Sequence, residues 1–155
     1  MASKKIGDAK KFVYDDDLVA LVDSEASVVR ETYVLEHLSF VSGTGTVPTA
    51  TVKLRKNKEI KTDAGVGDGA VDAVLKTIDR MTGKRGKLLD YQVRATTSGK
   101  DAVGEVTVKV DFGGAEPIIG RGASTDVVEA SAKAYLNAIN RALTNGKRHK
   151  TVRGV

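Results

Sequence analysis

The sequence predicts an α+β fold made of two packed βββα units with mostly antiparallel strands. The main observation is an internal repeat in the 155-residue chain. The strand-like runs Thr51–Leu54 and Thr107–Val110 are offset by 56 residues, and the helical motifs at Asp72 and Glu129 by 57. Each unit is too short to bury its own apolar face, so we expect the two units to stack about a pseudo-twofold axis. Such a stack would bring two glycine-rich helix starts into one structure.

The first unit is predicted from hydrophobic periodicity and turn residues. Residues 33–41 are rich in β-branched and aromatic side chains, and residues 49–55 alternate between apolar and polar. After a polar turn, residues 59–64 form a third strand. Residues 70–81 carry apolar side chains at helical spacing, and Gly83 follows at the position where glycine commonly ends a helix.

The second unit repeats this order. Residues 88–95 are predicted as a strand, residues 97–100 as a loop, and residues 104–112 as an alternating strand. Residues 117–121 lead into a helix that continues to Leu143.

The start of the second helix has more than one possible cap. Asp126 and Glu129 have the spacing of a capping box, and Ser124 or Thr125 could equally be the capping residue.

The predicted organisation is one domain with a short appendage at each end. Residues 1–32 are expected to be a disordered lead that includes a short capped helix, and residues 33–143 the folded domain, with repeats at 33–83 and 87–143. The second helix is predicted to end at Asn145–Gly146, which leaves residues 144–155 as a basic flexible tail.

The charge distribution argues against nucleic-acid binding. The net charge is +5, but residues 1–11 carry +3 and residues 144–155 carry +4, so the body carries −2. Basic ends on an acidic body are usually solvated termini, and the aromatic and arginine pattern of a recognition face is missing. No apolar run is long enough to span a membrane, and the absence of cysteine fits a cytoplasmic protein.

The residues of a catalytic or metal site are not found together. The two histidines, His37 in a predicted strand and His149 in the basic tail, form no ligand cluster. No Ser–His–Asp set or carboxylate pair can be assembled in a cleft-like context, so the chain is predicted to be non-catalytic.

The glycine-rich segments at residues 64–69 and 120–125 allow three interpretations. They could be purely structural turns that lead strands into helices. They could bind a phosphate, although the third glycine of a dinucleotide site and a Gly-Lys-Ser/Thr element are both missing. They could instead hold the carboxylate of an amino acid on helix-start N–H groups, with Asp68 taking the ammonium group. The residues alone do not distinguish among these three interpretations.

At four runs the chain resembles a known family, the C-terminal regulatory domain of 2-isopropylmalate synthase. These runs are residues 33–38, 42–50, 66–73 and 120–134, and the resemblance covers about residues 12–143. Citramalate synthases share this domain, so a domain that senses isoleucine is an alternative.

The resemblance implies a function. In the family, the full-length enzyme condenses acetyl-CoA with 2-oxoisovalerate in a metal-dependent TIM barrel, the first committed step of leucine synthesis. The regulatory domain dimerises and binds leucine as a feedback inhibitor. Within residues 1–32, the segment before Tyr33 resembles the end of the family's linker subdomain. The barrel is not in this chain, so we expect no catalytic residue, metal or cofactor here, and no activity of the chain alone. The expected partners are leucine, a second copy of the chain and the parent barrel, with no nucleic acid or membrane.

The resemblance also implies an effector site. Helix-start N–H groups would hold the carboxylate, Asp68 would pair with the ammonium group, and apolar residues of the second unit would enclose the isobutyl group. The predicted effector-binding residues are Asp68, Gly69, Ala70, Val71, Leu88, Tyr91, Ala95, Val106, Ala123, Ser124 and Thr125.

Simpler roles remain open for several of these residues. Val71, Leu88 and Val106 could be core residues, Tyr91 a half-buried strand residue, and Asp68 only a helix cap. The family usually has proline at the position of Ala70, and proline would stiffen the helix start. The domain could also be a dimerisation module without a ligand. Aspartate at Gly69 is predicted to weaken binding by crowding the turn and repelling the carboxylate.

Overall fold

The computed structural model describes residues 29–96 and 102–154, with side chains described up to Asn145. The predicted short helix in the lead and the predicted loop at residues 97–100 lie outside the described residues.

The first unit is a three-stranded antiparallel sheet followed by a helix. Its strands are β2 (Tyr33–Val41), β3 (Thr49–Lys56) and β4 (Glu59–Val66), in the order β2-β3-β4. Helix α2 (Ala70–Thr82) follows, and Gly83 ends it with a φ of 74°. Glycine adopts this left-handed conformation without a steric cost, as expected from the sequence.

The second unit has the same order of elements. Its strands are β5 (Lys87–Ala95), β6 (Gly104–Asp111) and β7 (Ile118–Ser124), again antiparallel in sequence order, followed by helix α3 (Val127–Gly154). The prediction of two βββα units in an α+β fold is confirmed.

The two sheets have equivalent registers. Leu38 lies opposite Val52 in the first sheet, and Tyr91 lies opposite Val108 in the second. Each first strand also has an irregularity near its beginning, between Leu35 and His37 in β2 and between Leu88 and Asp90 in β5. The repeat seen in the sequence is therefore a repeat of strand pairing as well.

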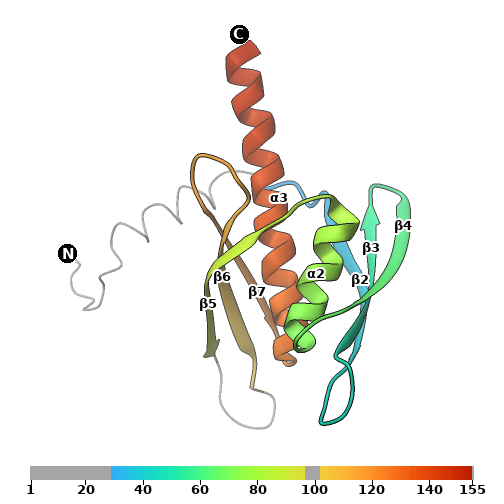
Figure 1. The fold of residues 1–155 in the computed structure, drawn as a ribbon. Helices are drawn as coiled ribbons and strands as arrows, with labels where there is room; N and C mark the ends of the chain where they lie inside the picture. Colours follow the sequence, from blue (N-terminus) through green and yellow to red (C-terminus); the bar gives the residue numbers. More distant parts are fainter. Residues whose placement is uncertain (1–28, 97–101, 155) are drawn as a thin grey trace, which may run out of the picture.

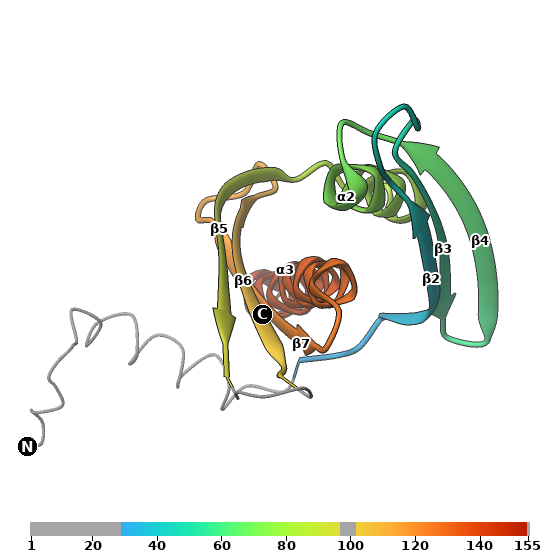
Figure 2. The same ribbon diagram turned by 90° about the horizontal axis from the view of Figure 1, so that it is seen from below.

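The two helices lie between the two sheets and begin at the same end of the molecule (Figures 1 and 2). Helix α2 packs on β3 and β4, helix α3 packs on β6 and β7, and the two helices also contact each other. The core lies where the sheets meet the helices, because alternate residues of the central strands face inward. The buried residues of the central strands are the apolar members of the two predicted alternating segments, Ala50, Val52 and Leu54 in β3 and Val106, Val108 and Val110 in β6.

The predicted glycine-rich turn at residues 120–125 is wrong for most of its length. Residues up to Ser124 belong to β7, and Gly120 and Gly122 lie directly under α3. A Cβ on Gly120 would be 2.7 Å from the Ala138 nitrogen, and one on Gly122 would be 2.6 Å from the Ala130 oxygen. These glycines thus let a helix backbone lie against a strand, a role that differs from turn formation.

Helix α3 also differs from the prediction, because it continues to Gly154 and does not end at Asn145–Gly146. The last residues include Lys147, Arg148 and Lys150. Lysine and arginine favour the helical conformation, and basic residues are favoured near a helix C-terminus. Among the described residues, no helix is long and apolar enough to cross a membrane.

Candidate functional site

The predicted effector-binding residues lie on the two helix starts and on the second sheet. Asp68, Gly69, Ala70 and Val71 form the start of α2, while Ser124 and Thr125 lead into α3. Because both helices begin at the same end of the molecule, the structure brings these two segments to one end (Figure 1). The remaining predicted residues lie on β5, β6 and β7.

The start of α2 has no side-chain cap. Gly69 is the N-cap residue and cannot supply one, and the first helical hydrogen bond runs from the Ala73 N–H to the Gly69 carbonyl at 2.9 Å. No described residue accepts a hydrogen bond from the N–H groups of Ala70 and Val71. These groups, at the positive end of the helix dipole, can therefore bind a carboxylate.

Two aspartates flank this helix start. The Asp72 carboxylate accepts a hydrogen bond from the Asp68 N–H at 2.8 Å and pairs with Lys76 at 3.0 Å. The Asp68 N–H, followed by the ion pair with Lys76, lowers the pKa of Asp72. The Asp68 carboxylate is exposed and makes no hydrogen bond or ion pair with any described residue. Asp68 is therefore not the cap of α2, and its carboxylate is available to a ligand.

The start of α3 is capped by its own side chains. The Asp126 carboxylate accepts hydrogen bonds from the N–H groups of Val128 at 2.7 Å and Glu129 at 3.2 Å. The Ser124 hydroxyl donates to the Glu129 carboxylate at 2.6 Å and accepts from the Asp126 N–H at 3.1 Å. Of the three candidates, Asp126 is thus the cap, and Ser124 and Glu129 support it. The two helix starts differ in their capacity to bind an anion.

Leu88, Tyr91 and Ala95 face the helix side of the second sheet. They lie opposite Val110, Val108 and Gly104, and residues paired across an antiparallel sheet share a face. Val106, also predicted, is fully buried on this face, so the interpretation of it as a core residue is correct. Leu88 is 40% exposed, so it is not a core residue.

Tyr91 is anchored to α3 by a hydrogen bond that no pattern in the sequence indicates. Its hydroxyl lies 2.6 Å from the hydroxyl of Ser131, and the Ser131 hydroxyl donates to the Val127 carbonyl at 2.7 Å. Serine has a single hydroxyl proton, so Tyr91 must donate to Ser131. The lone pairs of the tyrosine oxygen remain available to a donor. The only sequence signal for Ser131 is its place one turn after the helix start.

Two further residues change the predicted set. Ala123 lies opposite Glu105 on the sheet face away from the helices, so the structure separates it from the other candidates. Val93 lies opposite Val106 on the helix side and is 48% exposed. An apolar residue with this exposure on an inward face is a candidate contact, and alternation along β5 could have indicated it.

A partly buried hydrogen bond between α2 and α3 joins the two units. Tyr135 of α3 donates to the Asp79 carboxylate of α2 at 2.5 Å, and Tyr135 is 1% exposed. Burial is the main cause that raises the pKa of both groups. Among the described residues, no group of three or more histidine, cysteine or acidic side chains is placed to hold a metal ion.

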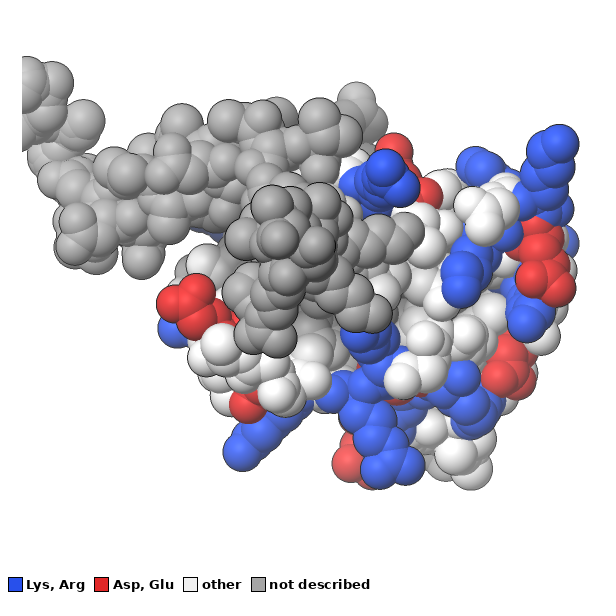
Figure 3. All heavy atoms as spheres, turned by 90° about the horizontal axis from the view of Figure 1, so that it is seen from above, with Lys and Arg blue, Asp and Glu red and all other residues white. Residues whose placement is uncertain are grey.

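The charged side chains do not form a single binding stripe on the face around the emerging α3. In Figure 3, lysine and arginine side chains on this face are interspersed with acidic and uncharged residues. This view adds no support for a nucleic-acid interface.

A model of one protein family, the LeuA allosteric (dimerisation) domain, matches residues 12–143. This range includes all the predicted effector-binding residues and both repeats. It agrees with the range over which the sequence resembles the regulatory domain.

Curated relatives include 2-isopropylmalate synthases from several bacteria. The protein from Methylacidiphilum infernorum is 55% identical over 140 residues, which is 90% of this chain and 28% of the relative. The protein from Pelotomaculum thermopropionicum is 44% identical over 145 residues, 94% of this chain and 29% of the relative. The protein from Heliobacterium modesticaldum is 46% identical over 153 residues, 98% of this chain and 30% of the relative. The chain thus spans less than a third of each of these relatives.

Proposed function

The chain belongs to the LeuA allosteric (dimerisation) domain family, and we propose that it acts as a leucine-binding, dimerising regulatory domain of a 2-isopropylmalate synthase. In this proposal, leucine binding inhibits the condensation of acetyl-CoA with 2-oxoisovalerate in a catalytic barrel of the same enzyme. The chain senses the pathway product and performs no chemistry itself.

The observation that supports an amino-acid ligand is the uncapped start of α2 between two aspartates. The free N–H groups of Ala70 and Val71 suit a carboxylate, and the free carboxylate of Asp68 suits an ammonium group. Asp68 and Asp72 would repel a bare phosphate at the same position. A zwitterion satisfies both halves of this arrangement, and a nucleotide phosphate does not.

The capped start of α3 supports different roles for the two helix starts. Asp126 already occupies the N–H groups that a second carboxylate would need. The proposed carboxylate position is therefore at α2, and Ser124 and Thr125 border the site without binding that group.

The side-chain pocket is proposed on the helix-facing row of β5. Leu88, Tyr91, Val93 and Ala95 lie on this row, and all four offer exposed or partly exposed apolar surface. Burying an isobutyl group against such a surface contributes about 1.5–3 kcal/mol. The free lone pairs of the Tyr91 hydroxyl give the ammonium group a second acceptor beside Asp68.

Regulation requires that leucine bind two states of the enzyme with different affinity. In the proposed mechanism, bound leucine links the start of α2 in the first unit to β5 in the second, and so favours one relative arrangement of the units. A change in that arrangement is passed to the barrel through the segment that precedes the domain.

Isothermal titration calorimetry of the purified chain with leucine, isoleucine and valine tests the proposal. Saturable binding of leucine that is tighter than binding of isoleucine is the expected result. Preference for isoleucine would identify a citramalate synthase type of sensor. A dimer that binds none of the three would contradict the leucine site and leave a module that only assembles the enzyme.

A further inference from the structure

Three of the four sheet edges in the described part of the chain have backbone groups bound by helix side chains. Asn140 of α3 binds the edge of β2, where its amide oxygen accepts from the Tyr33 N–H at 3.0 Å and its amide nitrogen donates to the Tyr33 carbonyl at 3.0 Å. Such side chains protect an edge strand from pairing with another chain.

The edges of β4 and β7 are bound at equivalent positions of the two repeats. Arg80 of α2 donates to the Ala64 carbonyl of β4. Asn137 of α3 accepts from the Arg121 N–H of β7 at 3.0 Å. Each of these two edges thus has one backbone group bound by the helix of its own unit.

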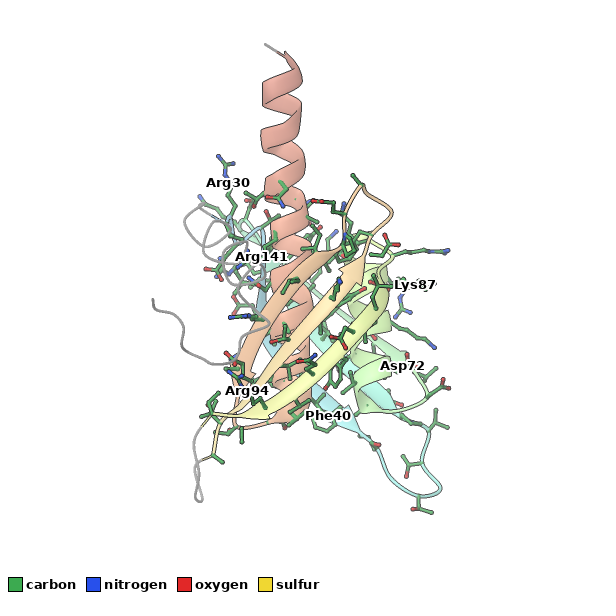
Figure 4. The ribbon with its side chains drawn as sticks, turned by 90° about the vertical axis from the view of Figure 1, so that its left-hand side faces the viewer. Arg30, Phe40, Asp72, Lys87, Arg94 and Arg141 are labelled. Carbon is green, nitrogen blue, oxygen red and sulfur yellow. The ribbon has the colours of Figure 1, made fainter. Side chains whose placement is uncertain are left out.

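The edge of β5 differs from the other three. No helix side chain binds its backbone among the described residues, because α2 ends at Gly83 and has no counterpart to Asn140. Among the described residues, this edge has one backbone group bound by a side chain of the strand itself: the Asp90 carboxylate accepts from the adjacent Tyr91 N–H at 3.0 Å and from the Gln92 side-chain amide at 3.0 Å. Figure 4 shows β5, from Lys87 to Arg94, as the outermost strand on this side.

Exposed apolar side chains gather on the same strand. Leu88, Leu89 and Val93 are 40%, 46% and 48% exposed. An edge strand of nine residues with this composition would be a liability in a protein that stayed monomeric.

We propose that the outer edge of β5, which no helix side chain binds, pairs antiparallel with β5 of a second copy of the chain, about a two-fold axis at Gln92. This inference rests on the proposed function, which supplies the binding partner, a second copy of the chain. It adds which strand forms the interface and in which register the two strands pair. The pairing joins two three-stranded sheets into one six-stranded sheet across the dimer.

The backbone of β5 limits the possible registers. The Thr96 N–H donates to the Val103 carbonyl beside β6, in the same register as the pairs between β5 and β6. Backbone groups alternate between the two edges of a strand, so those of Tyr91, Val93 and Ala95 face the free edge. A two-fold pairing must therefore place an axis on a residue and not between two residues.

Among these registers, an axis at Gln92 gives charge complementarity. It places Asp90 opposite Arg94 of the second copy, twice by symmetry, and Tyr91 opposite Val93. Arg94 is free to take part, because its side chain is 78% exposed and its contact with Glu105 is long, at 3.6 Å. Axes at Tyr91 or Val93 place Asp90 opposite Gln92 or Thr96, without an opposite charge.

Single-cysteine variants of the full chain test this register, because the chain contains no cysteine. Gln92 would form a non-hydrogen-bonded pair with itself across the axis, where Cα atoms are about 4.5 Å apart, within disulfide range. Gln92→Cys is expected to form a disulfide dimer under mild oxidation. The matched controls are Thr62→Cys on the β4 edge and Thr107→Cys on the central strand β6, which should stay uncrosslinked.

Charge reversal gives a second, non-covalent test. Arg94→Asp and Asp90→Arg are each expected to raise the dimer dissociation constant by at least about tenfold, and the double variant to restore it within about threefold. Sedimentation velocity over a concentration series measures these constants.

The outcomes separate this inference from the proposed function. A wild-type dimer whose Gln92→Cys variant does not crosslink, or in which Thr62→Cys crosslinks instead, would overturn the β5 interface and leave the regulatory function standing. A wild-type chain that stays monomeric at every concentration would contradict both.

Discussion

Tyr135 and Asp79 join the two repeats through one short hydrogen bond. The phenol of Tyr135, on α3, donates to the carboxylate of Asp79, on α2, at 2.5 Å. The tyrosine is fully buried, while the aspartate is partly buried. This bond links the two helices that begin at the proposed site, so it contributes to how one unit lies against the other.

Removal of the Tyr135 hydroxyl should destabilise the domain. Tyr135→Phe leaves the partly buried Asp79 carboxylate without its donor on α3, and we expect a loss of about 1–3 kcal/mol in the free energy of unfolding. Urea unfolding followed by circular dichroism measures it. A change below the error of the method would show that the bond contributes nothing to docking of the units.

The same aspartate should give a pH dependence of known sign. Burial raises the pKa of Asp79 above 3.8, so the folded protein keeps a proton that the unfolded chain has already lost. The stability from this proton is present at low pH and lost as the pH rises through the raised pKa. Asp79→Asn cannot titrate, so the wild type should gain stability relative to this variant on acidification. Unfolding curves of both proteins at acidic and neutral pH test this, and a constant difference would contradict it.

Asp68→Ala should abolish leucine binding without unfolding the domain. The Asp68 carboxylate has no hydrogen-bond or ion-pair partner among the described residues, so its loss costs little stability. It does remove the proposed partner of the ammonium group. Calorimetry measures the affinity, with the exposed Glu59→Gln as a matched loss of charge. Unchanged affinity in Asp68→Ala would eliminate the ammonium role.

Gly69→Asp should weaken leucine binding for a reason that differs from the crowding predicted from the sequence. A Cβ on Gly69 meets no atom within 4 Å, and its φ of −157° is an extended conformation that any residue adopts. Aspartate is a better N-cap than glycine by a few tenths of a kcal/mol, and its carboxylate would bind the N–H groups that the effector needs. We expect an equal or slightly higher melting temperature together with weaker leucine binding. A lower melting temperature would restore the crowding explanation.

Gly120→Ala should be strongly destabilising, because the contact at Gly120 is with helix backbone. The Ala138 nitrogen would lie 2.7 Å from the new Cβ, so α3 must move away from β7, at a cost of about 1–3 kcal/mol or more. Gly114→Ala is the control, since a Cβ there meets no atom within 4 Å. Thermal unfolding of the two variants compares them, and equal melting temperatures would show that β7 and α3 can separate easily.

Periodicity in the sequence was sufficient to predict the fold. The alternation in residues 49–55 and 104–112 identified the buried faces of β3 and β6, and the spacing of apolar residues located α2 to within one residue. These signals depend only on which side chains face the core, and they are local.

The features of the fold and of the candidate site that could not be predicted from the sequence depend on contacts between distant segments. The role of Gly120 and Gly122 follows from the approach of α3, which no local pattern shows. The hydrogen bond between Tyr91 and Ser131 joins residues 40 positions apart, and the cap on α3 depended on a choice among three adjacent oxygen-bearing side chains. The resemblance placed Ala123 in the site, but the register of β7 turns it to the other face.

The pair of hydrogen bonds between Asn140 and Tyr33 has a consequence for biosynthesis. The two residues are 107 positions apart, so these bonds to the edge of β2 can form only after α3 has been synthesised. Contacts of such long sequence separation slow folding, because a large loop must close before they form. On the ribosome, the first repeat would therefore emerge with an open edge, and the nascent chain would complete its fold only after α3 had left the exit tunnel.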